Sequence, residues 1–255
     1  METSVFPASD YVLAATLGLV LGSFMLAAAL RYPELKGFAT GRSACPACHS
    51  SLAACDLVPV LSWLWLRARC RRCAARIGWH YPAAELAGAG IAVWAATVFS
   101  GWLLWLSCGL GWCLLALSLF DMRSYRVPDA LTLPLLLAGL VVTFIAWPDE
   151  LSDHLLGAAL GYAVVAGIAA LYRHLRRRQG IGLGDAKLLA AGGAWLSWQP
   201  LPTVVLVAAA LAMLAAVAAA ASRRVPLSPA LRVPFAPFLG LAIWLIWLYG
   251  VPEIG

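Results

Sequence analysis

Residues 102–121 have the sequence WLLWLSCGLGWCLLALSLFD, an apolar run of membrane-spanning length that ends in an acid, Asp121. A second acid, Asp185, closes the segment Gly182-Leu183-Gly184-Asp185 and begins another apolar run at 186–198. An ionisable side chain at a membrane is costly, which makes each of these acids a candidate for function. Two carboxylates at matching depth suggest a pair that shares a proton and activates water.

The composition is that of a membrane protein. The chain has 255 residues, of which 63% are hydrophobic and 12% are charged, whereas about 25% are charged in a typical soluble domain. We therefore expect an all-α polytopic membrane protein with about eight transmembrane helices. The short run at 186–198 requires the glycines and Asp185 to lie at the membrane edge, or a locally thinned bilayer. The expected spans are 11–30, 83–100, 102–120, 131–147, 154–172, 186–198, 201–221 and 236–250.

The positive charges predict the orientation in the membrane. All 18 Lys and Arg residues lie in alternate connections or at their edges, and the other connections and both termini carry none. By the positive-inside rule the basic connections are cytoplasmic and both termini are outside, which requires an even number of spans. The net charge of +6 then reflects topology and contact with anionic membrane lipid. We expect no nucleic-acid binding, because the basic residues are divided among four loops.

The connection 31–82 contains two Cys-x2-Cys pairs, Cys45 with Cys48 and Cys70 with Cys73. Two such pairs are typical of a tetrahedral thiolate metal site. Cytoplasmic thiols stay reduced, which argues against disulfides. Zinc is the first choice, and iron remains open because it also accepts four thiolates. Four protein ligands close the site, so we expect a structural metal that stabilises this small loop.

Each residue of the two acidic segments also has a simpler interpretation. Asp185 could be a helix N-cap, whereas a carboxylate at a helix C-terminus, as at Asp121, is unfavourable. Asp129 follows a proline and is expected to be an ordinary N-cap. Gly182 and Gly184 either permit close backbone approach beside Asp185 or form a plain helix-entry turn. Lys187 either favours the ionised form of one carboxylate or binds lipid phosphate.

The order of these motifs resembles that of the type IV prepilin peptidases, also called leader peptidases. The resemblance covers nearly the whole chain, and the combination is far more specific than a lone Gly-x-Gly-Asp. The matching segments are Gly22-Ser23-Phe24, Arg31-Tyr32-Pro33, Cys45-Pro46-Ala47-Cys48, Leu61-Ser62-Trp63-Leu64, Arg67–Cys73, Tyr81-Pro82-Ala83-Ala84-Glu85, Asp121–Asp129, Gly182–Leu188 and Pro234-Phe235-Ala236-Pro237-Phe238.

The resemblance implies a function. It implies an aspartic endopeptidase of the bacterial inner membrane, with Asp121 and Asp185 as catalytic residues facing the cytoplasm. Its substrate would be a type IV prepilin or a type II secretion pseudopilin, cut after a glycine that follows a short basic leader. Many family members then methylate the new N-terminal amine with S-adenosylmethionine. The implied domains are 1–30, the first transmembrane helix; 31–82, the cytoplasmic metal-binding loop; and 83–255, the transmembrane peptidase.

Three positions depart from the family pattern. Leu26 and Leu57 replace asparagines, and Ala236 replaces a glycine. None of these changes involves either aspartate, so they bear on methylation more than on cleavage. We favour the bifunctional enzyme over a peptidase that does not methylate. A proton-coupled transporter is disfavoured because the acids lie at the membrane edge and no inverted repeat is evident. The sequence does not determine the oligomeric state.

Overall fold

The computed structural model describes residues 8–32, 43–176, 182–223 and 233–250. Within these ranges the chain is helical, and the only β-pairing consists of two isolated bridges. Part of the predicted metal-binding loop, 33–42, lies outside the described residues, as do six of the basic residues used for the topology. The helices are α1 Ala8–Arg31, α2 Leu61–Trp65, α3 His80–Val98, α4 Gly101–Ser124, α5 Asp129–Ala146, α6 Leu151–Arg176, α7 Leu183–Leu196, α8 Leu201–Arg223 and α9 Ala236–Tyr249.

Each of the eight apolar runs forms one helix, and the all-α membrane fold is confirmed. Among the described residues, five helices are long and apolar enough to cross a bilayer, namely α1, α4, α5, α6 with the turn before it, and α8. Helix α9 is apolar but shorter. That α3, α7 and α9 also cross the membrane, which would make eight spans, therefore stays a prediction.

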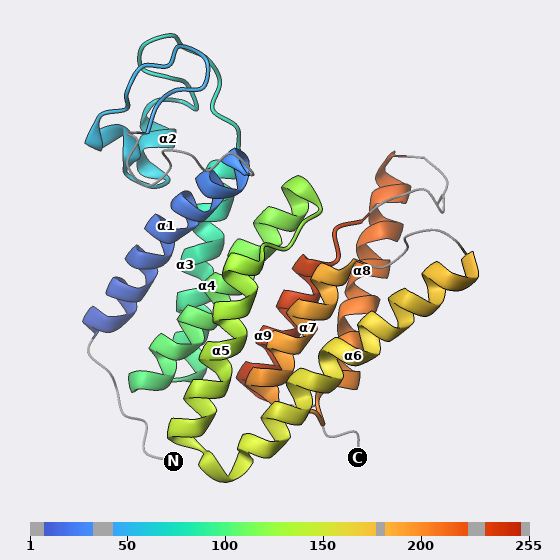
Figure 1. Ribbon diagram of the computed structural model, residues 1–255. Coiled ribbons are helices and arrows are strands. Elements are labelled where there is room, and N and C mark those ends of the chain that lie inside the picture. The colour runs from blue at the N-terminus through green and yellow to red at the C-terminus, as the bar shows by residue number, and fades with distance from the viewer. Residues whose placement is uncertain (1–7, 33–42, 177–181, 224–232, 251–255) are drawn as a thin grey trace. The chain divides into compact units, whose positions relative to one another are not determined.

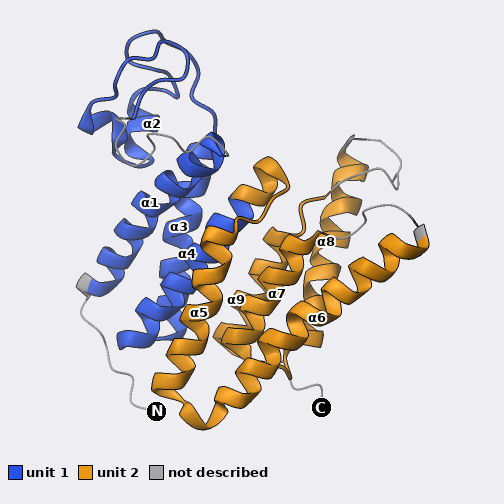
Figure 2. Ribbon diagram, in the orientation of Figure 1, with its two compact units in different colours: residues 1–119 blue, residues 120–255 orange. Residues whose placement is uncertain are grey.

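The chain forms two compact units, residues 1–119 and residues 120–255 (Figure 2). The first contains α1 to α3 and most of α4, together with the cysteine loop. The second contains the end of α4 and α5 to α9. Both candidate catalytic aspartates belong to the second unit, and all four loop cysteines belong to the first. The domain boundaries expected after residues 30 and 82 remain predictions.

Helices α1 and α3 of the first unit pack backbone to backbone through glycines. A Cβ placed on Gly88 would stand 2.1 Å from the carbonyl oxygen of Gly18, and one on Gly22 would stand 2.2 Å from that of Ala84. Such small-residue contacts are typical of helix pairs in membranes, where packing replaces the hydrophobic effect. Trp112 of α4 donates its indole N–H to the Gly88 carbonyl at 2.9 Å.

Helix α7 is the centre of the second unit, in contact with α5, α6, α8 and α9 (Figure 1). Every residue from Ala186 to Trp195 is buried except Lys187. The contacts are again close: a Cβ on Gly193 would stand 2.2 Å from the carbonyl oxygen of Gly157 in α6.

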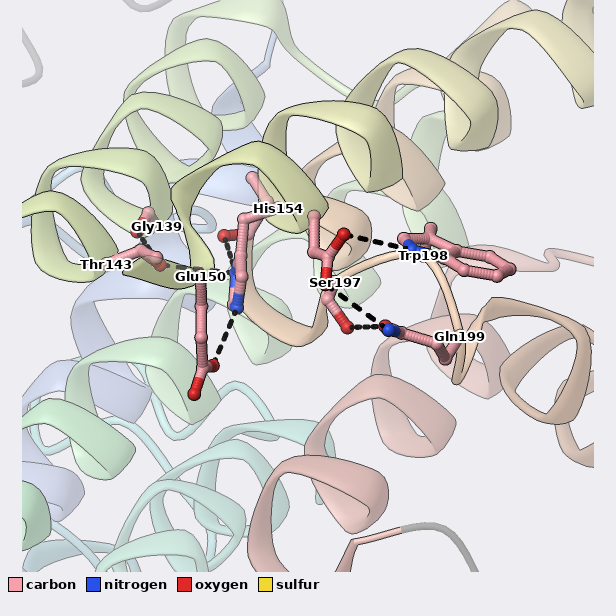
Figure 3. A network of polar contacts seen from close by, with 9 residues as sticks. Gly139, Thr143, Glu150, His154, Ser197, Trp198 and Gln199 are labelled. Carbon is pink, nitrogen blue, oxygen red and sulfur yellow. Dashed lines mark hydrogen bonds and ion pairs between the residues drawn. The ribbon is translucent and has the colours of Figure 1, made fainter. Parts of the chain in front are cut away.

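A buried histidine joins three helices at the end of α7 remote from Asp185 (Figure 3). His154 of α6 has its Nδ1 3.0 Å from the carbonyl oxygen of Ala194 and 3.2 Å from Oγ1 of Thr143. A carbonyl only accepts hydrogen bonds, so Nδ1 carries the proton. Glu150 lies 3.8 Å from Nε2 on the other side of the ring. This network fixes one end of the helix whose other end carries Asp185.

We predict that Gly88→Ala destabilises the first unit, because its methyl group would overlap the backbone of α1. Overpacking of this kind costs about 1–3 kcal/mol. Gly90→Ala, two residues along the same helix, is the matched control, since a Cβ there meets nothing within 4 Å. Thermal unfolding in detergent measures the stability of both variants. Equal stability of the two variants would contradict the close α1–α3 contact.

Candidate active site and metal centre

Asp121 lies in the last turn of α4 and is 6% exposed. The backbone N–H of Ala236, the first residue of α9, donates to its Oδ2 at 3.0 Å, and the N–H of Phe235 also interacts with this carboxylate. The first N–H groups of a helix have no partner within the helix, and its positive end attracts anions. The start of α9 therefore offsets the unfavourable position of a carboxylate at the end of α4.

Asp185 is the third residue of α7, and the N-cap of this helix is Gly182. The N-cap interpretation of Asp185 is therefore wrong. Its carboxylate is half-buried, and no hydrogen bond to it occurs among the described residues. The charge of Asp121 acts on it electrostatically. The second unit thus brings together the two acids that the sequence singled out, one held by backbone N–H groups and one without a donor.

The two glycines before Asp185 have different surroundings. A Cβ on Gly184 would stand 3.0 Å from Cβ and Cγ2 of Val127, in the segment that follows Asp121. A Cβ on Gly182 would make only an ordinary contact, 3.6 Å from Oδ2 of Asp185. Close approach is therefore required at Gly184, where the two acidic segments touch.

An ion pair joins the same two segments. Lys187 Nζ donates to both carboxylate oxygens of Asp129, at 2.6 and 2.8 Å. Pro128, not Asp129, is the N-cap of α5, so the N-cap prediction for Asp129 is wrong. Lys187 is bound to this neighbouring acid. The pairing was invisible in the sequence because 58 residues separate the partners.

The three departures from the family pattern lie in different surroundings. Ala236 keeps the hydrogen bond to Asp121, because every residue except proline has a backbone N–H. Leu26 is 6% exposed within α1. Leu57 is 48% exposed in the cysteine loop and lines a cavity there.

The four predicted cysteines converge on one point. The Sγ atoms of Cys45, Cys48, Cys70 and Cys73 all lie within 4.8 Å of one another, and those of Cys45 and Cys73 are 3.8 Å apart. Four sulfurs at about 2.3 Å from a central zinc stand about 3.8 Å from each other in a tetrahedron. The cluster could hold a metal such as zinc. Cys55, Cys108 and Cys113 do not belong to it.

The two cysteine turns have the same backbone structure. In each turn the first cysteine accepts a hydrogen bond from the residue four positions later, His49 at 2.9 Å and Ala74 at 3.0 Å. These two residues have φ of 55° and 56°. Each turn is closed by an antiparallel bridge, Ala44 with Ser51 and Arg69 with Arg76. Two equivalent turns facing each other place two ligands each around one metal position.

Hydrogen bonds to the sulfurs favour thiolates at two of the four positions. The Ser50 hydroxyl and backbone lower the pKa of Cys48 to about 6, and the backbone N–H groups of Cys73 and Arg72 lower the pKa of Cys70. At Cys73 a bond from Ala75 lowers the pKa, but burial and the three neighbouring cysteines outweigh it and raise the pKa to about 11. Four adjacent thiols resist full ionisation, and a bound cation removes that resistance.

We predict that the purified protein holds about one zinc per chain and that Cys70→Ser releases it. Without the metal, the loop loses its main source of folding free energy and becomes more sensitive to proteases. Cys55→Ser is the control, because this exposed thiol lies outside the cluster. Elemental analysis and limited proteolysis measure both effects. Iron in place of zinc would change the ion and keep the site, whereas absence of metal would refute the prediction.

We predict that Gly184→Ala lowers the catalytic rate, because the new methyl group would push Val127 and separate the acidic segments. Gly182→Ala should be tolerated, since its Cβ makes an ordinary contact. The double variant Gly184→Ala with Val127→Gly should recover activity, because it removes both the Cβ and the Cγ2 that the new methyl group would crowd. The rate of prepilin cleavage in detergent measures the effect of each variant. If the substitution at Val127 does not restore the rate lost in Gly184→Ala, the contact between these two residues is not the cause of the loss.

Two protein-family models match the sequence of this chain. The family model described as Bacterial Peptidase A24 N-terminal domain matches residues 16–99, and that described as Type IV leader peptidase family matches residues 108–217. No solved structure matches the chain.

Several curated relatives carry the name prepilin leader peptidase/N-methyltransferase. The one from Burkholderia pseudomallei (strain 1026b) is 41% identical over 266 residues, covering 94% of this chain and 85% of the relative. Those from Aeromonas hydrophila and Pseudomonas aeruginosa are 40% and 31% identical, covering 82% and 92% of this chain and 72% and 88% of the relative. With its apolar helices, the chain is an integral membrane protein, and it belongs to the type IV leader peptidase family.

Proposed function

We propose that this protein is a membrane-embedded aspartic endopeptidase that removes the leader from type IV prepilins or type II secretion pseudopilins. The observation that carries the proposal is the meeting of two acidic segments in one unit: Gly184, which precedes Asp185, approaches Val127, in the segment that follows buried Asp121. Membership of the leader peptidase family and the names of the relatives support the substrate class.

The unequal surroundings of the acids suggest their roles. The backbone N–H of Ala236 donates to Asp121, and among the described residues no such donor reaches the Asp185 carboxylate, so we assign Asp121 as the general base that removes a proton from water. Asp185 then holds the shared proton and donates it to the oxygen of the scissile carbonyl. Water adds to the carbonyl carbon, and the tetrahedral intermediate collapses when the proton returns to the leaving amine.

The charge pattern supports an active site at the cytoplasmic side of the inner membrane. Asp121 ends one predicted span and Asp185 begins another, and both lie beside basic connections. A prepilin with a basic leader and an apolar stem would keep its stem in the bilayer, while the bond between them reaches the aspartates. The leader would remain in the cytoplasm.

The cysteine cluster supports a structural zinc ion. Four cysteines supply all the ligands of a tetrahedral site, so the chain leaves no open position for substrate or water. When bound, zinc supplies a fixed cross-link between the two cysteine turns. We assign it no chemical step in the cleavage.

We further propose that the enzyme methylates the new N-terminal amine with S-adenosylmethionine. The name shared by the relatives includes N-methyltransferase, which supports this second activity. The alternative is a peptidase that does not methylate, favoured by the apolar residues at positions 26 and 57. Incubation of purified protein with a prepilin, with and without S-adenosylmethionine, separates the two by the mass of the product.

We predict that Asp121→Asn and Asp185→Asn each reduce cleavage at least a hundredfold, because each removes one partner of the proton exchange. The double variant should be no slower than the slower single variant, as expected for groups that act as a unit. Membrane insertion and zinc content should be unchanged. Cleavage of a prepilin in detergent measures the rates.

Asp129→Asn is the matched control for these variants. It neutralises a nearby carboxylate that pairs with Lys187 and has no place in the proton exchange. We expect cleavage within a few-fold of the wild-type rate, since exposed ion pairs contribute little. A loss as large as that of Asp121→Asn would mean that the catalytic acid of this segment has been misassigned.

A further inference from the structure

The short helix α2 of the cysteine loop has an apolar face that the described part of the protein leaves uncovered. Leu61, Leu64 and Trp65 have the i, i+3, i+4 spacing of one helix face, and they are 65%, 58% and 86% exposed. The opposite face, with Trp63, lines a cavity of about 440 Å³ within the first unit. Exposed apolar patches typically mark a surface that contacts another molecule or a membrane.

The contacts between α1 and α3 give the level at which α2 meets them. The glycine contacts make these two helices antiparallel, and Glu85 of α3 lies beside Gly22 of α1. Gly22 is nine residues before the end of α1 at Arg31, which is about 13 Å at the helical rise per residue. Glu85 is therefore level with a residue inside the candidate membrane span Asp10–Arg31.

The Glu85 side chain holds the start of α2 near this level. Its Oε2 accepts the backbone N–H of Val60, the N-cap residue of α2, at 2.7 Å. Helical side chains lean toward the helix N-terminus, so α2 begins between the level of Glu85 and the end of α1. Ser23, Ala27 and Arg31, in the last turns of α1, line the same cavity as the inner face of α2. Figure 1 shows α2 on the side of the cysteine loop that is nearer to α1 and α3.

Residues suited to a membrane–water interface flank the apolar face. Trp79, the N-cap residue of α3, is 75% exposed where the loop joins that helix. Tryptophan is enriched at the level of the lipid head groups. Arg67 follows α2, and its backbone N–H donates to the carbonyl of Leu64 at 3.0 Å, which fixes it beside the apolar face. Arg67 and Arg69 are exposed, do not line the cavity and form no ion pair with the described residues.

The charge of the loop suits an anionic surface. Residues 43–79 contain five arginines and one acid, Asp56, which pairs with Arg71 at 2.8 Å. This excess of positive charge is larger than the double negative charge of a zinc ion held by four thiolates. Basic residues beside a membrane are attracted to anionic lipid, and arginine can lay its stem on apolar surface while its head group reaches phosphate.

From these features we infer that the cysteine loop is docked on an anionic bilayer surface through α2. Leu61, Leu64 and Trp65 enter the edge of the acyl-chain region, while Trp79 and Arg67 lie among the head groups. The depth of α2 favours lipid over a protein partner, because a face level with a membrane span meets lipid first. The loop is then part of the membrane surface and not a domain free in the cytoplasm.

The test is photochemical cross-linking from the outer face of α2. The full-length variant Trp65→p-benzoylphenylalanine is reconstituted in vesicles of phosphatidylethanolamine and phosphatidylglycerol, irradiated, and its peptides are analysed by mass spectrometry. We expect lipid adducts as the main product. The same replacement at Trp63 is the matched control, since this tryptophan lies on the opposite face of the same helix. There we expect cross-links within the first unit.

The arginine contact is tested in the same assay. Arg67→Gln, added to the variant at position 65, should weaken docking roughly fivefold in the anionic vesicles, the usual contribution of one basic residue. The lipid adducts should decrease there and stay unchanged in vesicles of phosphatidylcholine. An equal yield of adducts with and without Arg67 in the anionic vesicles would overturn the contact between this arginine and phosphate.

Other products would overturn the docking on lipid. These are cross-links from position 65 to a second copy of the chain, to residues 120–255 or to an added prepilin, and the absence of any adduct. Zinc content and thermal unfolding report whether each variant is folded. If the variant at position 65 does not fold, Leu64→p-benzoylphenylalanine tests the same face from the neighbouring position.

Discussion

The hydrogen bond from the backbone of Ala236 to Asp121 is the interaction on which the proposed active site depends. A buried carboxylate at the negative end of α4 is unfavourable unless donors reach it. Those donors come from the start of α9, more than a hundred residues later in the chain. The acid therefore ties the end of α4, which belongs to the second unit, to the start of α9, and α7, which carries Asp185, packs against α9.

Glycine supplies the second constraint, because it determines how closely these helices approach. At Gly184 the missing side chain lets the segment before Asp185 touch Val127, and at Gly193 it lets α7 touch α6. At its opposite end α7 is held by the carbonyl of Ala194, which accepts a hydrogen bond from His154. Fixed at both ends and buried along its length, α7 can hold one carboxylate in place relative to another.

Sequence reasoning could single out the side chains of the two proposed sites but not the groups that position them. Asp121, Asp185 and the four cysteines stood out because acids in apolar runs and paired cysteines are rare. The N–H of Ala236 could not stand out, since every residue except proline has one. Asp129 was misjudged because a local pattern, acid after proline, is common at helix starts, and its distant partner Lys187 is visible only in the fold. His154 was missed because nothing local distinguishes a core histidine.

The two proposed sites, the aspartate pair and the cysteine cluster, depend on different interactions in different units of the chain. Cleavage depends on two acids whose environment comes from helix packing in residues 120–255, and no departure from the family pattern disturbs it, because Ala236 acts through its backbone. The proposed metal site depends on two cysteine turns in residues 1–119, and there the departure at Leu57 falls on the wall of a cavity that Cys45 and Cys70 also line. A substitution in the cysteine loop can therefore change this cavity without altering the aspartates.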